Sequence, residues 1–310
     1  MMTQIEGLHH VTALARDAQR NNDFFTHILG LRRVKKTVNF DRPDVYHLYY
    51  GDKVGTPGGV MTYFPFPGSD PGHAGTGEVA ATVFAVPERA LPYWRERLTN
   101  HGVDNVSNET YFGAERLCFS GPDGDSLALV EQPGDSRDVW TGSDIPADTA
   151  IRGFHSVTLH VADGAPMSDL LKFMGYRPAE ADGDHHRFAL PTHNNAGIVD
   201  VRVSPDGRPA RQGAGSVHHV AFAVADRAAQ GDVRKALVDA GVDVTDVIDR
   251  DYFWAIYFRT PGGILFEVAT DEPGFARDED VAHLGEALKL PVQHAHLRDR
   301  LEKELPAITD

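Results

Sequence analysis

The chain has 310 residues, 41% of them hydrophobic, which is enough for two domains of ordinary size with a substantial core. A formal net charge of −15 argues against nucleic acids and anionic membranes as partners, and no apolar run approaches the length of a membrane span. The single cysteine, Cys118, excludes a disulfide scaffold and cysteine-based zinc sites. Because the N-terminus lacks a signal-peptide pattern, we expect a cytoplasmic protein.

An internal repeat dominates the rest of the sequence. Apolar strands open four modules at residues 7–14, 77–86, 153–162 and 215–224. A helical pattern ending near a glycine or asparagine follows each strand, at residues 20–29, 88–98, 167–174 and 231–240. Further strands come next, and Pro-Asp-Gly or Pro-Gly-Gly turns join the last two in the second and fourth modules. Each module is therefore expected to be β-α-β-β-β.

The modules predict an α+β fold of curved mixed sheets. We expect an N-terminal domain of two modules (1–135), a linker rich in small and polar residues (136–152) and a C-terminal domain of two modules (153–270). A tail (271–310) with helices at 279–288 and 292–305 is expected to pack on the body.

Two histidine pairs and one glutamate stand out in the apolar strands. His9-His10 lies on the first opening strand, His218-His219 on the fourth, and Glu267 on the last strand of the fourth module. Side chains alternate between the two faces of a strand. The alternation places His10, His219 and Glu267 on the concave face, beside small neighbours. It places His9 and His218 on the opposite face, or at bulged positions near the site.

The repeat provides an internal comparison for these residues. Alignment of the modules puts Ala81, Ser156 and Ala128 at the positions of the ligand candidates, so the scaffold itself does not require histidine or glutamate there. A buried carboxylate is unfavourable unless it meets a cation or good hydrogen bonds. Two imidazoles with one carboxylate match the facial triad of non-haem Fe(II) oxygenases, although Mn(II), zinc or another divalent metal stays open. The alternative is a pair of core histidines with a structural ion pair.

This arrangement over residues 5–270 resembles the vicinal oxygen chelate superfamily, which includes glyoxalase I, extradiol dioxygenases and bleomycin-binding proteins. Glyoxalase I uses a fourth protein ligand, and we expect its position at Ala128, which cannot bind a metal. A site that joins modules one and four resembles the hydroquinone-cleaving branch. That resemblance implies an arginine and a tyrosine upstream of the glutamate, and Arg250 and Tyr257 occupy such positions. The His-His-x-Thr pattern that ends at Thr12 also matches.

The resemblance implies an Fe(II)-dependent, extradiol-type ring-cleaving dioxygenase that inserts O2 into a hydroquinone-like dihydroxybenzene. It implies metal binding by His10, His219 and Glu267, with orienting or proton-transfer roles for a second group: Tyr257, Arg250, His218, His9 and Thr12. Two alternatives stay open, a glyoxalase-like metal-dependent lyase or isomerase and a non-catalytic protein that binds aromatic compounds. We expect segments 38–70 and 184–198 to line the pocket, and the sequence leaves a homo-oligomer open.

Charged residues are chosen unevenly, with 31 Asp against 7 Lys. Such a composition either forms an ordinary solvated acidic surface or indicates a salt-rich cytosol. Stability that fails to increase at molar salt would exclude the second interpretation.

Overall fold

Each of the four modules contributes four strands to the computed structural model, which describes residues 2–309. Module one has β1 (Gly7–Ala15), β2 (Arg32–Val38), β3 (Tyr46–Gly51) and β4 (Val60–Pro65), and module two has β5 (Glu78–Val86), β6 (Ser107–Tyr111), β7 (Ala114–Ser120) and β8 (Ser126–Glu131). Module three has β9 (Gly153–Val161), β10 (Arg177–Asp182), β11 (His185–Ala189) and β12 (Ile198–Val203). Module four has β13 (Val217–Val224), β14 (Ile248–Asp249), β15 (Phe253–Arg259) and β16 (Leu265–Pro273).

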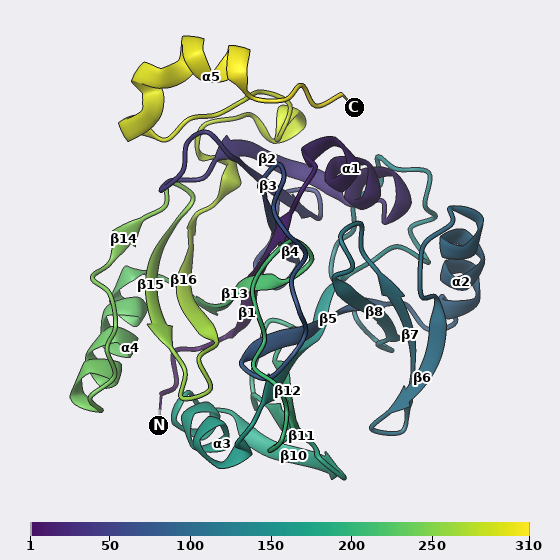
Figure 1. The fold of residues 1–310 in the computed structure, drawn as a ribbon, viewed down its shortest axis with the longest axis vertical. Coiled ribbons are helices and arrows are strands. Elements are labelled where there is room, and N and C mark those ends of the chain that lie inside the picture. The colour runs from purple at the N-terminus through teal and green to yellow at the C-terminus, as the bar shows by residue number, and fades with distance from the viewer. Residues whose placement is uncertain (1, 310) are drawn as a thin grey trace.

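These strands form two eight-stranded mixed sheets within the described residues, as the α+β prediction requires (Figure 1). The first sheet has the order β14-β15-β16-β13-β1-β4-β3-β2, and the second has the order β10-β11-β12-β9-β5-β8-β7-β6. At the centre of the first sheet, β1 pairs antiparallel with β13, and at the centre of the second, β5 pairs with β9. Each sheet therefore combines one module from each half of the chain: one with four, and two with three.

A helix follows the opening strand of every module, with bounds somewhat different from the expected ones. The helices are α1 (Ala18–Asp23, continued as a π-helix at Phe24–Ile28), α2 (Leu91–Asn100), α3 (Gly164–Phe173) and α4 (Arg227–Asp239). Three of them begin earlier than expected because an aspartate side chain accepts a hydrogen bond from a backbone N–H of the first turn. The capping residues are Asp17, Asp163 and Asp226.

The two faces of the first sheet differ in character. On strands β13 and β16, Phe222, Phe266 and Val268 are fully buried in the main apolar core, to which α4 contributes Val233 and Leu237. The alternate residues of the same strands point the other way, toward the interior of the curved sheet. That face carries the histidines and Glu267, so the strand alternation that builds the core also positions the site.

The C-terminal tail crosses the first sheet above β2 and β3 (Figure 1). The prediction of a helix at 279–288 was wrong. This segment has only a short 3-10 turn (Val281–His283) and then runs beside β2, where Leu288 forms a β-bridge with Lys36. The buried ammonium of Lys35 anchors the start of this segment by donating hydrogen bonds to the carboxylates of Asp278 and Glu279. The helix expected at 292–305 is present as a 3-10 segment (Val292–Leu297) followed by α5 (Arg298–Glu304).

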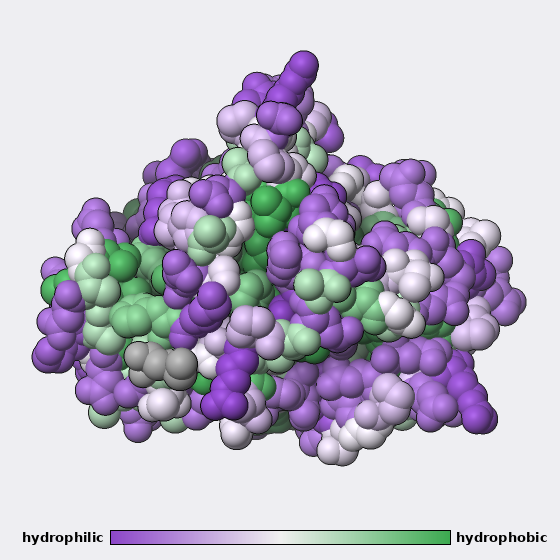
Figure 2. Space-filling view, turned by 90° about the horizontal axis from the view of Figure 1, so that it is seen from below, coloured by the Kyte–Doolittle hydropathy of each residue, from purple (hydrophilic) through white to green (hydrophobic). Residues whose placement is uncertain are grey.

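Hydrophilic residues cover most of the face shown in Figure 2, and the hydrophobic residues visible there are gathered in separate areas between them. This pattern is consistent with a chain in which 24% of residues are charged. Within residues 2–309, no helix has the length and apolar character needed to cross a membrane.

Candidate metal centre and cavity

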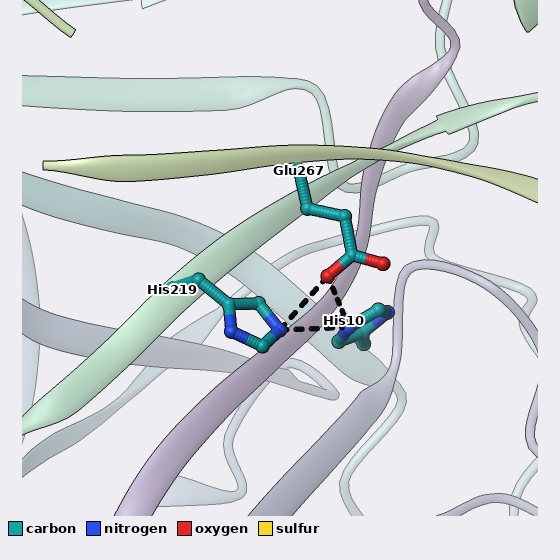
Figure 3. A group of neighbouring side chains, drawn as sticks. All are labelled: His10, His219 and Glu267. Atoms are coloured by element: carbon teal, nitrogen blue, oxygen red, sulfur yellow. Dashed lines mark hydrogen bonds and ion pairs between the residues drawn. The ribbon is translucent and has the colours of Figure 1, made fainter. Parts of the chain in front are cut away.

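Three side chains from three strands converge on one point of the first sheet (Figure 3). His10 comes from β1, His219 from β13 and Glu267 from β16, and their potential ligand atoms all lie within 4.8 Å of one another. The two histidine Nε2 atoms are 3.2 Å apart. The nearer oxygen of Glu267, Oε2, lies 2.9 Å from Nε2 of His219 and 3.4 Å from Nε2 of His10. The structure thus brings together the three residues expected to bind a metal.

The surroundings of Glu267 are unusual for a carboxylate. Its side chain is fully buried, and among the described residues neither carboxylate oxygen has a hydrogen-bond donor in good geometry. Burial opposes its ionisation, but the neighbouring imidazoles of His10 and His219 hold its pKa well below the ordinary value. Burial also lowers the pKa of His219, against the attraction of Glu267. A buried carboxylate without well-placed donors, next to two imidazole nitrogens, is the donor set that a divalent cation binds, so these residues fit a metal ion.

A chain of hydrogen bonds sets the direction of the lone pair on His10. Nδ1 of His10 lies 2.9 Å from Nδ1 of His9, and Nε2 of His9 lies 3.2 Å from the carbonyl oxygen of Thr270. A carbonyl only accepts, so Nε2 of His9 carries the proton, and its Nδ1 must accept from Nδ1–H of His10. Nε2 of His10 is then unprotonated and directed at the ligand cluster, as metal binding requires. Burial, followed by repulsion from His10, lowers the pKa of His9 to about 3, which keeps it neutral.

His218 stands in the same relation to His219. Their Nδ1 atoms are 2.8 Å apart. With Nε2 of His219 directed at the cluster, its Nδ1–H donates to Nδ1 of His218, and His218 carries its own proton on Nε2. Burial, followed by repulsion from His219, lowers the pKa of His218 to about 3.

Both neighbouring histidines occupy β-bulges. The register between β1 and β13 shifts by one residue at His9 and again at His218, which leaves each of them as the extra residue of its strand. Of the two expected placements, the bulged position near the site is therefore the observed one, and the opposite face is not. The β5–β9 pair has matching shifts at Ala80 and His155, so the bulge belongs to the repeated scaffold.

Tyr257 and Arg250 lie on the same side of the sheet as the ligand cluster. Tyr257 is the cross-strand partner of Glu267, and its ring meets that of His219 edge-on at 5.9 Å. Nε of Arg250 donates to the Tyr257 hydroxyl at 3.2 Å. Burial and then the charge of Glu267 raise the pKa of Tyr257 well above its ordinary value, so the phenol keeps its proton. Tyr257 is therefore a neutral donor beside the cluster.

A cavity of about 260 Å³ opens next to these residues. The cluster forms one part of its wall, together with His218, Arg250 and Tyr257, and phenylalanines form much of the rest: Phe40, Phe64, Phe66 and Phe253. The cavity is slightly smaller than most ligand pockets, which span about 300–1,000 Å³, and this size suits a single aromatic ring. His9 and Thr12 are not among the lining residues and lie behind the wall. Segment 38–70 does line the cavity, whereas the expectation for 184–198 was wrong, because that segment belongs to the second sheet.

Sequence reasoning missed a second group of polar side chains on the cavity wall. His47 Nε2 lies 2.9 Å from the Thr62 hydroxyl, and its Nδ1 lies 2.8 Å from the Tyr49 hydroxyl. The Thr62 hydroxyl in turn lies 2.8 Å from that of Thr12. The repeat held a signal for one of them, since Tyr49 faces Thr62 across strands β3 and β4 as Tyr257 faces Glu267 across β15 and β16.

The fourth ligand position was placed wrongly at Ala128. Glu267 pairs with Ala221 on the opening strand of its module, and in module one the same register pairs Thr62 with Thr12. The fourth position in this sheet is thus Thr62, whose hydroxyl is already hydrogen-bonded, whereas Ala128 lies in the other sheet.

Alignment of the modules had placed no histidine or carboxylate at the corresponding positions of the second sheet. In module three, however, one of these positions does carry a ligand-type side chain. Asp200 occupies the position of Glu267 in module three and is fully buried. Arg187 binds its two carboxylate oxygens at 2.8 and 3.0 Å. A guanidinium therefore neutralises the carboxylate there.

Comparison with known sequences and structures agrees with the fold. The sequence model of the Glyoxalase/Bleomycin resistance protein/Dioxygenase superfamily matches residues 7–268. The chain belongs to this superfamily. A superfamily member from Zea mays, glyoxalase I, shares its fold with a TM-score of 0.64 over 86% of this chain and 92% of that one, at 13% identity.

Superfamily members with greater similarity span nearly the whole chain. The sequence is 40% identical to a Bacillus subtilis protein named as ring-cleaving dioxygenase MhqO, over 98% of this chain and 97% of that protein. It is 36% identical to a chlorohydroquinone/hydroquinone 1,2-dioxygenase of Sphingobium indicum, over 96% and 95% of the two chains. A crystal structure titled as a dioxygenase from Bacillus subtilis superposes with a TM-score of 0.95 at 39% identity, covering 99% and 98%.

Proposed function

We propose that the protein is an Fe(II)-dependent ring-cleaving dioxygenase that acts on a hydroquinone-like dihydroxybenzene with O2. The observation that carries the proposal is the buried Glu267 carboxylate, which lacks donors and meets two imidazoles at the wall of a cavity sized for one ring. The names of the full-length relatives support the reaction class, and the Sphingobium relative supports the substrate class.

His10, His219 and Glu267 would hold the metal. Two histidines and a carboxylate leave open positions, and in this ligand type Fe(II) supplies the activation of O2 and lowers the pKa of a bound phenol. Mn(II) is compatible with the same donors. A structural zinc site would instead have four protein ligands, and the hydrogen-bonded Thr62 is a poor fourth.

The remaining residues would act on the substrate. Tyr257 accepts a hydrogen bond from Arg250 and, with its raised pKa, keeps its own proton, which it could donate to a substrate oxygen. The guanidinium of Arg250 places positive charge at the cavity wall, where it stabilises a phenolate or developing negative charge. His218 carries its proton on Nε2 and lines the cavity, which suits proton transfer to the product. The phenylalanine walls exclude water from the reacting groups.

Anaerobic purification followed by metal analysis and an oxygen electrode tests the proposal. We expect about one iron per chain, with oxygen uptake in the presence of hydroquinone or methylhydroquinone and less with catechol. Turnover without oxygen uptake would indicate a glyoxalase-like lyase or isomerase. Binding of aromatic compounds without turnover would indicate a binding protein. Either result would contradict the proposal.

The variant His10→Ala tests the position of the site. It should lose metal binding, because His10 supplies one of three ligands. His155→Ala removes a histidine from the matching opening strand of module three and should bind metal normally. Unchanged metal content in His10→Ala would return the site to module three.

A further inference from the structure

We propose that the side-chain amide of Asn39 selects substrate rings that carry an oxygen opposite the metal-bound one, by donating a hydrogen bond to it. This inference rests on the proposed function, since it concerns the same cavity. Asn39 follows β2 at the start of the loop that leads to β3, and it lines the cavity together with Phe40.

The orientation of the Asn39 amide is fixed by its own loop. Its Oδ1 accepts hydrogen bonds from the backbone N–H groups of Asp41 at 2.9 Å and Arg42 at 3.2 Å. Its backbone N–H donates to the carbonyl of Val45 at 2.8 Å. Two donors at Oδ1 settle which end of the amide is oxygen, so the NH2 group is the end left over.

The NH2 group of Asn39 has no hydrogen-bond partner among residues 2–309, and although the residue is only 9% exposed, this group is not one of the fully buried polar atoms of the structure. An unpaired donor that is not sealed in the core, on a residue of the cavity wall, is available to a ligand in the cavity. The neighbouring polar groups are already engaged. His47 has a partner at each ring nitrogen, and Arg42 donates twice to Asp44.

The exposure of its neighbours places the loop of Asn39 at the open side of the cavity, whereas the metal ligands lie at the closed side. His10 and Glu267 are buried to 1% and 0% exposure, whereas the side chains of Asp41 and Arg42, next to Asn39, are 79% and 59% exposed. The cavity therefore runs from a closed end at the ligands to an outer end at this loop. A ring bound through one oxygen at the closed end would direct its para substituent toward the outer end.

A fixed donor at that end favours an acceptor in the para position. Hydroquinones carry one, whereas alkylphenols do not. A neutral hydrogen bond contributes about 0.5–1.5 kcal/mol, which corresponds to a preference of about 2- to 10-fold. The contribution can be measured as a change in the ratio of two affinities, so that the general difference in hydrophobicity between the two ligands cancels.

The test uses anaerobic calorimetry with the metal-loaded protein and two ligands of similar shape, 4-methoxyphenol and 4-ethylphenol. Asn39→Asp keeps an acceptor for the two loop N–H groups and removes the donor. Asn39→Ser also keeps a local acceptor, without adding charge. Both variants should shift the affinity ratio toward 4-ethylphenol by about 2- to 10-fold. Lys53→Gln, an exposed change in the next loop and outside the cavity lining, is the control and should leave the ratio unchanged.

The outcomes separate this inference from the proposed function. If wild-type protein consumes oxygen with hydroquinone and binds both phenols, but the two Asn39 variants keep the wild-type ratio, the inference alone is wrong. If wild-type protein binds neither phenol and consumes no oxygen, both the inference and the proposed function are wrong.

Discussion

The hydrogen bond between His9 and His10 should control metal affinity. In His9→Phe, a ring of similar size stays beside Phe253, whose ring centroid lies 5.3 Å from that of His9, but the acceptor for Nδ1–H of His10 is lost. His10 is 1% exposed, so this N–H would stay buried without a partner, which costs about 1–3 kcal/mol. Loss of such a supporting partner typically lowers metal affinity about 10- to 100-fold, which corresponds to about 1.4–2.7 kcal/mol. The two estimates agree.

Competition with a fluorescent chelator under anaerobic conditions measures this affinity. The matched control is His155→Phe, because His155 occupies the corresponding bulge of the second sheet and contacts Ser156 rather than a ligand histidine. We expect it to bind metal like the wild type. The reasoning would be refuted if His9→Phe stayed within twofold of the wild-type affinity, or if His155→Phe weakened binding equally.

Three further predictions concern Glu267, Asp125 and Cys118. Glu267→Gln should abolish stoichiometric metal binding, because it replaces the one carboxylate of the three ligands with a neutral amide; retention of about one metal ion per chain by elemental analysis would argue against this. Burial raises the pKa of Asp125 to about 6, even though its Oδ2 accepts a hydrogen bond from the Tyr63 hydroxyl. Between about pH 4 and pH 6 the folded state therefore keeps a proton on Asp125 that the unfolded state has lost, so the contribution of this residue to stability falls as the pH rises through that range. The free energy of unfolding of Asp125→Asn, measured in urea from pH 4 to 7, should rise relative to that of the wild type as the pH increases to about 6. Above pH 6 the difference between the two proteins should stay constant; a difference that is the same at every pH would contradict this prediction. Burial and then Glu109 raise the pKa of the Cys118 thiol to about 12, so iodoacetamide at pH 8 should modify it at least tens of times more slowly than free cysteine, and a rate equal to that of free cysteine would contradict the assignment.

Much of the fold could be predicted because the signals are local and repeated. Strand alternation and helix stops near a glycine or asparagine recur in every module, tight turns recur in two of them, and together they indicate the β-α-β-β-β order. The prediction of a helix at 279–288 failed because the conformation of this segment depends on residues far away in the sequence. Lys35 on β2 binds Asp278 and Glu279, and no local pattern encodes that contact.

The candidate site was predictable where alternation alone decides, as for His10, His219 and Glu267. The placement of His9 and His218 was not, because a bulge is a property of two paired strands and one strand's sequence does not show it. The fourth position required knowledge of which modules share a sheet, and for that reason Ala128 was chosen over Thr62. Asn39 gave no signal, since an asparagine in a loop most often serves only the turn.

The pairing of the first module with the last has a consequence for folding during synthesis. His10 and His219 are 209 residues apart in sequence, and Glu267 comes later still. A ribosome must therefore release more than two thirds of the polypeptide before β1 can meet β13, whereas β5 and β9 emerge much closer together. Until then β1 has an unpaired edge that can pair with other chains. Any truncated product that lacks β16 would lack Glu267, so the candidate metal centre could be completed only near the end of synthesis.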